Sequence, residues 1–193
     1  MDKLTREDLM PLERYAADRN DFRRQVIAHK KQRNVALGSH VTLLFEDRLT
    51  VQYQVQEMLR IERIFEPEGI QGELDAYNPL VPDGGNLKAT LLFEFTDPDE
   101  RTQRLTQLGG IEPRVFADVA GQPRVFARAD EDLGRSDVDK TSAVHFLRFE
   151  FPAAAIAALR GGAALAFGID DPRLPERATL SATQRQALAG DFG

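Results

Sequence analysis

Residues 41–64 read VTLLFEDRLTVQYQVQEMLRIERI, and this stretch joins a strand-forming segment to a helix-forming one. Its first six residues include β-branched and aromatic types, which favour strands. From Thr50 onward the apolar positions fit both strand alternation and helical spacing, but QEMLR consists of good helix formers without β-branching. We therefore expect a helix over about residues 50–64, directly after a strand.

The segments on either side predict a hairpin and further helices. RNVALGSHVTLLFED contains two β-rich pieces around a Gly-Ser pair, which indicates a hairpin over about residues 33–46. Before it, a Thr-x-x-Asp pattern resembles a capping box and is followed by apolar residues at helical spacing, so helices should occupy much of residues 5–32. A short helix near residues 68–77 should end before an Asn-Pro dipeptide.

Glycine and proline divide the second half of the chain more sharply. The expected order of elements is strand, helix, hairpin, strand, helix, strand and a last short helix. Asp97 and Pro98 begin the first of these helices and a Gly-Gly pair ends it, while Pro152 begins the second. The arms of the hairpin should cover about residues 113–119 and 124–129.

Together these elements predict an α+β protein. We expect a mixed, largely antiparallel sheet with helices on one face, preceded by an N-terminal helical layer and a β-hairpin. A single domain should span residues 1–193, with the helical layer and hairpin in residues 1–85 and a sheet-rich body in residues 86–193.

Composition places the chain among soluble globular proteins and narrows its chemistry. With 42% apolar residues, 29% charged residues and no cysteine, it excludes thiolate catalysis, iron–sulfur ligation through cysteine and cysteine-type zinc sites. The N-terminus lacks the apolar core of a signal peptide, and no apolar run approaches the ~20 residues that span a bilayer. We therefore expect a cytoplasmic protein.

Positive charge is concentrated near the N-terminus. Residues 1–40 carry nine Lys and Arg against six Asp and Glu, a net charge of +3, while the whole chain carries −6. Five cations in this segment form a cluster that could meet phosphate, namely Arg23, Arg24, Lys30, Lys31 and Arg33. The simpler interpretation is a solvated helix face, and the acidic balance of the chain and the lack of interleaved aromatic residues argue against nucleic-acid binding.

The sequence contains no local motif for a metal, a nucleotide or another cofactor. Its histidines, His29, His40 and His145, are too scattered for a paired-histidine site, and His145 fits a structural, hydrogen-bonded role in a strand. His40, at the tip of the hairpin, is the best exposed general base or ligand. The acidic loop of residues 129–140 lacks the spacing of a calcium-binding EF-hand, and the glycine pairs form no phosphate-binding loop.

The crowded charges of the central helix are the strongest local feature. At helical spacing Glu57, Arg60 and Arg63 share one face, while Glu62 lies away from it. Such pairs in water contribute only ~0.2 to 0.5 kcal/mol each, too little to explain the arrangement. If these charges are partly buried, the cost of desolvation makes a functional or partner-binding role the better interpretation.

Longer strings in the same region resemble a known family. TLLFEDR, QEMLR, ELDAYNPLVP, LKATLLFEF and AVHFLRFEFP are similar to the bacterial domain-of-unknown-function family number three-five-zero-one, and the resemblance spans essentially the whole chain. The family has no assigned activity, so the resemblance implies no catalytic residue. It implies a redox or peroxide-defence pathway, because the genes are commonly grouped with those of a rubrerythrin-like di-iron protein and an iron–sulfur oxidoreductase.

Two main kinds of function remain open from the sequence, with nonspecific nucleic-acid binding through the basic N-terminal helix as a weaker alternative. One is an accessory or interaction protein that docks to such a redox partner through residues 46–78, with the arginines facing acidic and the glutamates facing basic partner surface. The other is an enzyme or metal-binding protein, with His40, Glu46 and Glu57 as weak metal candidates. The candidate functional residues are Glu46, Tyr53, Glu57, Arg60, Glu62, Arg63 and Tyr77. A homodimer is the expected assembly, because two-fold dimers are the commonest oligomers.

Overall fold

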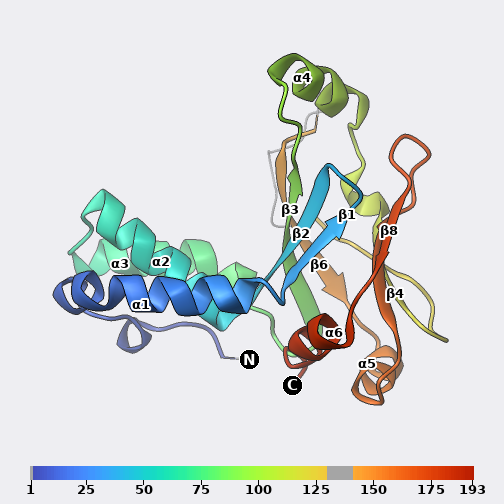
Figure 1. The fold of residues 1–193 in the computed structure, drawn as a ribbon. Coiled ribbons are helices and arrows are strands. Elements are labelled where there is room, and N and C mark those ends of the chain that lie inside the picture. Colours follow the sequence, from blue (N-terminus) through green and yellow to red (C-terminus); the bar gives the residue numbers. More distant parts are fainter. Residues whose placement is uncertain (1, 130–140) are drawn as a thin grey trace.

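The computed structural model describes residues 2–129 and 141–193, and it consists of a helical arm and two β-sheets (Figure 1). The arm contains α1 (Leu12–Lys30), α2 (Arg48–Glu62) and α3 (Pro67–Tyr77). Short 3₁₀ turns precede and follow these helices, η1 (Arg6–Asp8) and η2 (Asn78–Leu80). The carboxylates of the predicted acidic loop, from Asp130 to Asp139, lie outside the described residues.

Both sheets have four strands, and all of their strand pairs are antiparallel. The first sheet has the order β1 (Asn34–Leu37), β2 (Val41–Glu46), β3 (Asn86–Phe93) and β6 (Val144–Glu150). The second has the order β5 (Val125–Phe126), β4 (Val115–Val119), β7 (Leu165–Ile169) and β8 (Glu176–Thr179). The α+β class is therefore confirmed.

The strands divide between two sheets, whereas the sequence predicted one. Strands β2 and β6 bury alternate residues, so the first sheet needs a partner layer over one face. The second sheet supplies that layer, and Phe45, Phe149 and Phe167 meet in the core between them, with ring centroids 4.7 to 6.3 Å apart. At one edge, the backbone of Arg128 pairs with that of Arg148 and ties the sheets together.

Three more helices lie at the ends of the sheets. Helix α4 (Pro98–Gln107) lies at one end, and α5 (Ala153–Arg160) and α6 (Ala182–Ala189) lie at the other (Figure 1). As predicted, Asp97 caps α4, with its side chain accepting from the backbone N–H groups of the first turn. In the described part of the chain, none of the helices combines the length and the apolar character needed to cross a bilayer.

The stretch of residues 41–64 forms the junction between the arm and the sheets. Gly38 turns the hairpin with a positive φ of 63°, and α2 begins at Arg48 because the Asp47 side chain accepts from the Thr50 N–H at 2.9 Å. The predicted helix therefore forms, two residues earlier than expected. Because β2 buries Val41, Leu43 and Phe45 on its inner face, it turns Glu46 to the outer face of the first sheet.

Candidate functional site

The predicted charges of α2 form a network with α1. Glu57 accepts hydrogen bonds from the Tyr15 hydroxyl and from Arg19 Nε and Nη2, all at 2.7 Å. Arg60 adds two longer contacts to the same carboxylate, at 3.2 and 3.3 Å. Tyr15 is fully buried, and the Glu57 side chain is 12% exposed. The network therefore fastens α1 to α2, and protein donors occupy most of the acceptor positions of Glu57.

The ionisation of this network is fixed around neutral pH. The hydrogen bonds from Arg19, followed by those from Arg60 and Tyr15, lower the pKa of Glu57 to about 2 despite its partial burial. Burial and the hydrogen bond to Glu57 raise the pKa of Tyr15 well above its usual range. A proton-transfer group needs a pKa near the working pH, and the pKa of Glu57 is far below neutral pH. The contacts of Glu57 with α1 instead support a structural role, in which it holds the two helices of the arm together.

Glu46 and Tyr77 meet in a groove between the arm and the outer face of the first sheet. They line a cavity of about 290 Å³ together with Lys30, Thr50 and other residues of α2, β3 and β6. Glu46 accepts from the Thr50 hydroxyl at 2.6 Å and from the Thr90 hydroxyl at 3.1 Å. A second cavity of about 470 Å³ shares Tyr77 with the first and also contains Glu73, whose pKa is raised by burial and by the charge of Glu62.

The weak metal candidates do not converge. His40 lies at the hairpin end of β2 and Glu46 at its other end, six residues or about 20 Å away along a strand. Glu57 faces α1 and lines neither groove cavity. Among residues 2–129 and 141–193, no three His, Asp or Glu side chains are grouped so that they could hold a metal ion.

The remaining candidates make no hydrogen bond to a described residue in either place, although Tyr53 lies near Tyr15 and the charge of Glu62 acts on Glu73. Tyr53 packs against Phe22 of α1, with ring centroids 5.9 Å apart. Glu62 and Arg63 are exposed at the outer end of α2. Of the seven candidate residues, the structure thus brings Glu57 together with Arg60 and Glu46 together with Tyr77.

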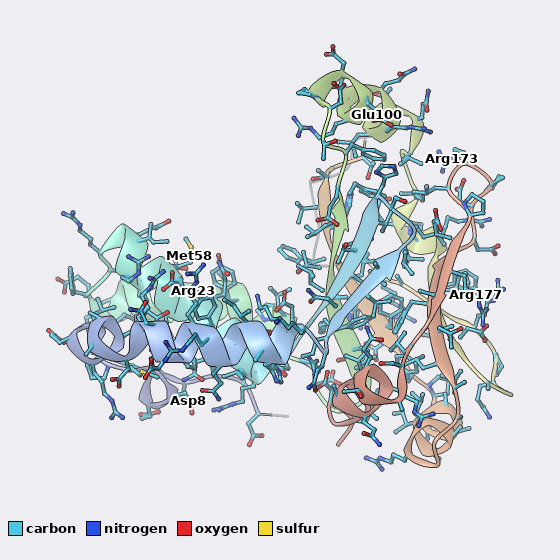
Figure 2. All side chains as sticks on the ribbon, viewed as in Figure 1. Asp8, Arg23, Met58, Glu100, Arg173 and Arg177 are labelled. Carbon is cyan, nitrogen blue, oxygen red and sulfur yellow. The ribbon has the colours of Figure 1, made fainter. Side chains whose placement is uncertain are left out.

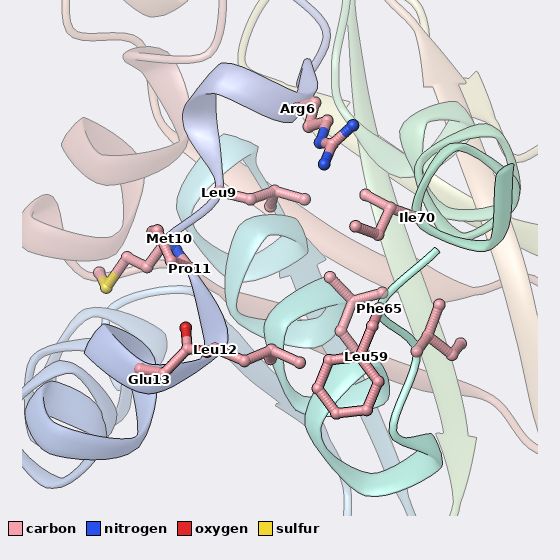
Figure 3. A pocket seen from close by; sticks show the side chains of 10 residues that line it. Arg6, Leu9, Met10, Pro11, Leu12, Glu13, Leu59, Phe65 and Ile70 are labelled. Atoms are coloured by element: carbon pink, nitrogen blue, oxygen red, sulfur yellow. The ribbon is translucent and has the colours of Figure 1, made fainter. Parts of the chain in front are cut away.

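The outer end of the arm carries an apolar surface that the sequence did not single out. A cavity of about 360 Å³ lies between the start of α1 and the ends of α2 and α3, and Figure 3 shows Leu9, Leu59 and Ile70 among its lining residues. Phe65 is one of the lining residues and is 63% exposed, while Ile61, in the last turn of α2 but outside the lining, is 61% exposed. We call Ile61, Phe65 and this cavity the arm tip. Helical periodicity alone places Ile61 off the buried face of α2, so its exposure could have been predicted from the sequence. The cavity could not, because it is formed by residues from separate segments of the chain.

The chain leaves α2 through an unfavourable conformation next to the arm tip. Arg63 has a φ of 56°, and it is the one residue other than glycine with a positive φ in the described part of the chain. Its N–H bonds to the Leu59 carbonyl and ends the helix. This left-handed conformation is usual for glycine after a helix and costs a side-chain-bearing residue about 1 kcal/mol.

We therefore expect Arg63→Gly to stabilise the protein. Relief of the left-handed strain, less the added freedom of the unfolded chain, should raise the free energy of unfolding by about 0.5 kcal/mol. Arg63→Ala, which keeps the strain, should give no such gain. Urea unfolding of both variants measures the difference, and equal stability of the two would show that the strain is absent.

The basic cluster of the N-terminal segment is divided by the fold. Arg23, Arg24 and Lys31 are exposed, and Lys30 lines the groove. Arg33 is buried, so the prediction that it belongs to a solvated cationic face is wrong. It donates to the backbone carbonyls of Phe45, Glu46 and Ala187, which a charged side chain with five donors can serve at once.

Arg33 also organises a buried charge cluster at the base of the arm. It pairs with both oxygens of Asp191 and lies 3.4 Å from Asp47, which in turn contacts His29 Nε2 at 2.5 Å. Burial raises the pKa of Asp191 to about 6, outweighing the attraction of Arg33. For Asp47, burial is outweighed by the charge of Arg33 and the Thr50 N–H, so its pKa is lowered. No local sequence signal connects Asp191 to this cluster.

His145 has the surroundings of a structural histidine. It is buried, its Nε2 lies 2.7 Å from the Thr141 hydroxyl, and the Glu112 carboxylate is 3.1 Å away. These contacts fit the role predicted from its place in a strand.

Comparisons with known proteins identify the family of the chain through a family model. No curated protein matches the chain. A crystal structure of a novel protein of unknown function from Burkholderia pseudomallei K96243 is 51% identical in sequence, with a TM-score of 0.94 over 100% of both chains. The family model described as Protein of unknown function (DUF3501) matches residues 3–192. Because that match covers nearly the whole sequence, the chain belongs to the DUF3501 family.

Proposed function

We propose that this chain is an accessory protein that binds a partner protein through the arm tip. The observation that carries the proposal is the exposure of Phe65 in the lining of an apolar cavity, with the exposed Ile61 nearby in the sequence at the same end of α2. When a partner protein covers large apolar side chains that are exposed to water, the free energy of the system falls and binding is favoured. An aromatic side chain next to a cavity can also act as an anchor, while the cavity receives a side chain from the partner.

The position of the arm tip supports the same function. The arm projects away from the sheets, so a partner can reach its end without meeting the rest of the molecule (Figure 1). Exposed charges of both signs surround the apolar residues, among them Arg6, Glu13, Glu62 and Arg63. Such a polar rim around an apolar centre is the usual anatomy of a protein interface, and its charges set orientation and association rate.

The family resemblance suggests which partners to test. The neighbouring genes implied by that resemblance encode a rubrerythrin-like protein and an iron–sulfur oxidoreductase, so we propose a role in a redox or peroxide-defence pathway. An accessory role also suits a chain without cysteine, because the partner would supply the redox centre.

Truncation of the anchor tests the proposal. We expect Phe65→Ala to weaken binding of the purified partner about tenfold or more, since buried aromatic anchors dominate interfaces. The matched control is Phe126→Ala, which removes another exposed phenylalanine, 42% exposed, from the sheets. Titration calorimetry against each of the two candidate partners gives the dissociation constants, and thermal unfolding shows whether each variant remains folded.

A negative charge introduced at the second apolar residue, Ile61, provides an independent comparison. Ile61→Glu should weaken binding as Phe65→Ala does, whereas Ile27→Glu, at an exposed isoleucine of α1, should not. Equal effects of the tip and control variants, or tight binding that all four variants leave unchanged, would show that the arm tip is not the docking surface.

A further inference from the structure

A separate cavity lies under α4, at the end of the sheets opposite α5 and α6. It has a volume of about 430 Å³ and lies between the β1–β2 turn, the C-terminal half of α4 and the loop that follows β7. Figure 2 shows Arg173 on that loop and Glu100 on α4. The volume is in the range of small-molecule sites, which are commonly 300–1,000 Å³.

One wall of this cavity is aromatic. The His40 ring stacks on Phe95, with centroids 4.9 Å apart and an angle of 24° between the planes. His40 Nδ1 makes a long contact of 3.4 Å with the Glu94 carbonyl, and Nε2 has no hydrogen-bond partner among the described residues. Leu108 and Leu174 add apolar surface. A flat ring bound in the cavity could therefore pack against the His40 ring and the two leucines, and His40 Nε2 could form a hydrogen bond to it.

Among the residues that the structure describes, the charged side chains that line this cavity are arginines. Arg104 and Arg173 line it with His40, and within the described chain no carboxylate lines it. Glu100, one turn earlier on the same face of α4, lies 3.7 Å from Arg104, and the Arg104 guanidinium, whose side chain is 51% exposed, makes no hydrogen bond to a described residue. Glu94 turns its carboxylate to the Thr42 hydroxyl. Arg104 is thus a cation with free donors.

Arg173 has a different part, because its donors are occupied. It forms a bidentate pair with Asp171, at 2.7 and 2.8 Å, and donates to the carbonyls of Gln107 and Gly109. These carbonyls lie at the C-terminal end of α4, where the helix dipole would otherwise repel an anion. Arg173 satisfies these carbonyls and fixes the loop that closes the cavity.

We propose that the cavity under α4 binds a small organic anion with an aromatic body. The ring would stack on His40, and its carboxylate or phosphate would accept charge-assisted hydrogen bonds from Arg104. This site is independent of the arm tip, so either proposal can fail without the other.

Indole-3-acetate is a suitable probe, because the chain contains no tryptophan and indole fluorescence then reports on the ligand alone. Its fluorescence anisotropy should rise when the full chain is added. Tryptamine has the same ring but a positive charge, and it should bind at least about tenfold more weakly. Phenyl phosphate should displace the probe, which shows whether a phosphate can replace the carboxylate, and inorganic phosphate alone should not.

Two variants of α4 locate the binding site. Arg104→Gln should weaken indole-3-acetate binding about tenfold, whereas Arg101→Gln, at an exposed arginine of the same helix outside the cavity, should change it by less than about twofold. Amide NMR shifts on binding should centre on Leu108 and Leu174. Equal binding of tryptamine, equal losses in both variants, or no binding at millimolar probe would overturn the proposal.

Discussion

Replacement of Arg33 by methionine should lower the free energy of unfolding by about 3–5 kcal/mol, because it breaks a buried ion pair and leaves its partners behind. Arg33 is buried, and in its absence Asp191 loses its hydrogen-bonded cation, while the carbonyls of Phe45, Glu46 and Ala187 lose a donor. These groups come from the end of β2, just before α2 begins, from α6 and from the residues after it. We therefore expect the loss to loosen the whole base of the arm.

Urea unfolding of wild type and Arg33→Met measures this loss. The matched control is Arg24→Met, which removes an exposed arginine paired with Asp21 and should cost less than about 1 kcal/mol. Adding Asp191→Asn to Arg33→Met should restore part of the stability, because it removes the uncompensated charge. A loss below about 1 kcal/mol for Arg33→Met itself would contradict the assignment of Arg33 as the centre of the cluster.

The effect of Arg33→Met should also depend on pH. Burial already raises the pKa of Asp191 to about 6 in the wild type, and removal of Arg33 would raise it further. A raised carboxylate pKa means that the folded state takes up a proton more readily than the unfolded chain, so the cost of the buried charge falls as pH falls. The stability difference between wild type and variant should be smaller at pH 5 than at pH 8.

Replacement of Glu57 by leucine should cost about 2–4 kcal/mol, since it removes the acceptor that joins α1 to α2. The Tyr15 hydroxyl would be buried without a partner, and Arg19 would lose both of its short hydrogen bonds. Glu62→Leu is the matched control on the same helix, at an exposed glutamate without an ion-pair partner among the described residues, and should change stability by less than about 0.5 kcal/mol.

Acid should remove the advantage that Glu57 confers. Its pKa is lowered from 4.5 to about 2 in the folded protein, so its contribution is complete above pH 4.5 and is lost as pH falls toward 2. The stability difference between wild type and Glu57→Leu, followed by urea unfolding at several pH values, should narrow over that interval. A difference that stays constant from pH 7 to pH 3 would mean that the carboxylate charge does not support the arm.

Local sequence signals were sufficient for most helices and turns. Asp97 caps α4 as predicted, and the hairpin turns at Gly38, because capping and turn geometry depend on a few neighbouring residues. Strand β8 was missed, since its four residues, ERAT, include two charges and no apolar alternation. Its place is set by pairing with β7, which sequence-local rules cannot see.

The candidate site was predictable only in part, for the same reason. Helical spacing placed Glu57 beside Arg60, but the partners that explain the arrangement, Tyr15 and Arg19, lie about 40 residues earlier in the chain. Arg33 looked like one more cation of a solvated run, and its burial depends on Asp191 at the other end of the sequence. Burial decides between a surface charge and a structural one, and burial is a property of the tertiary fold.

The most direct test of the docking surface is a photo-crosslink from the arm tip. A benzophenone amino acid is placed at Phe65 or, as a control, at Phe126, and the full chain is irradiated with each purified candidate partner. We predict a crosslink to one of these partners from position 65 that Ile61→Glu abolishes, that Ile27→Glu leaves intact, and that position 126 does not give. Crosslinks of equal yield from both positions, or from position 126 alone, would contradict docking through the arm tip.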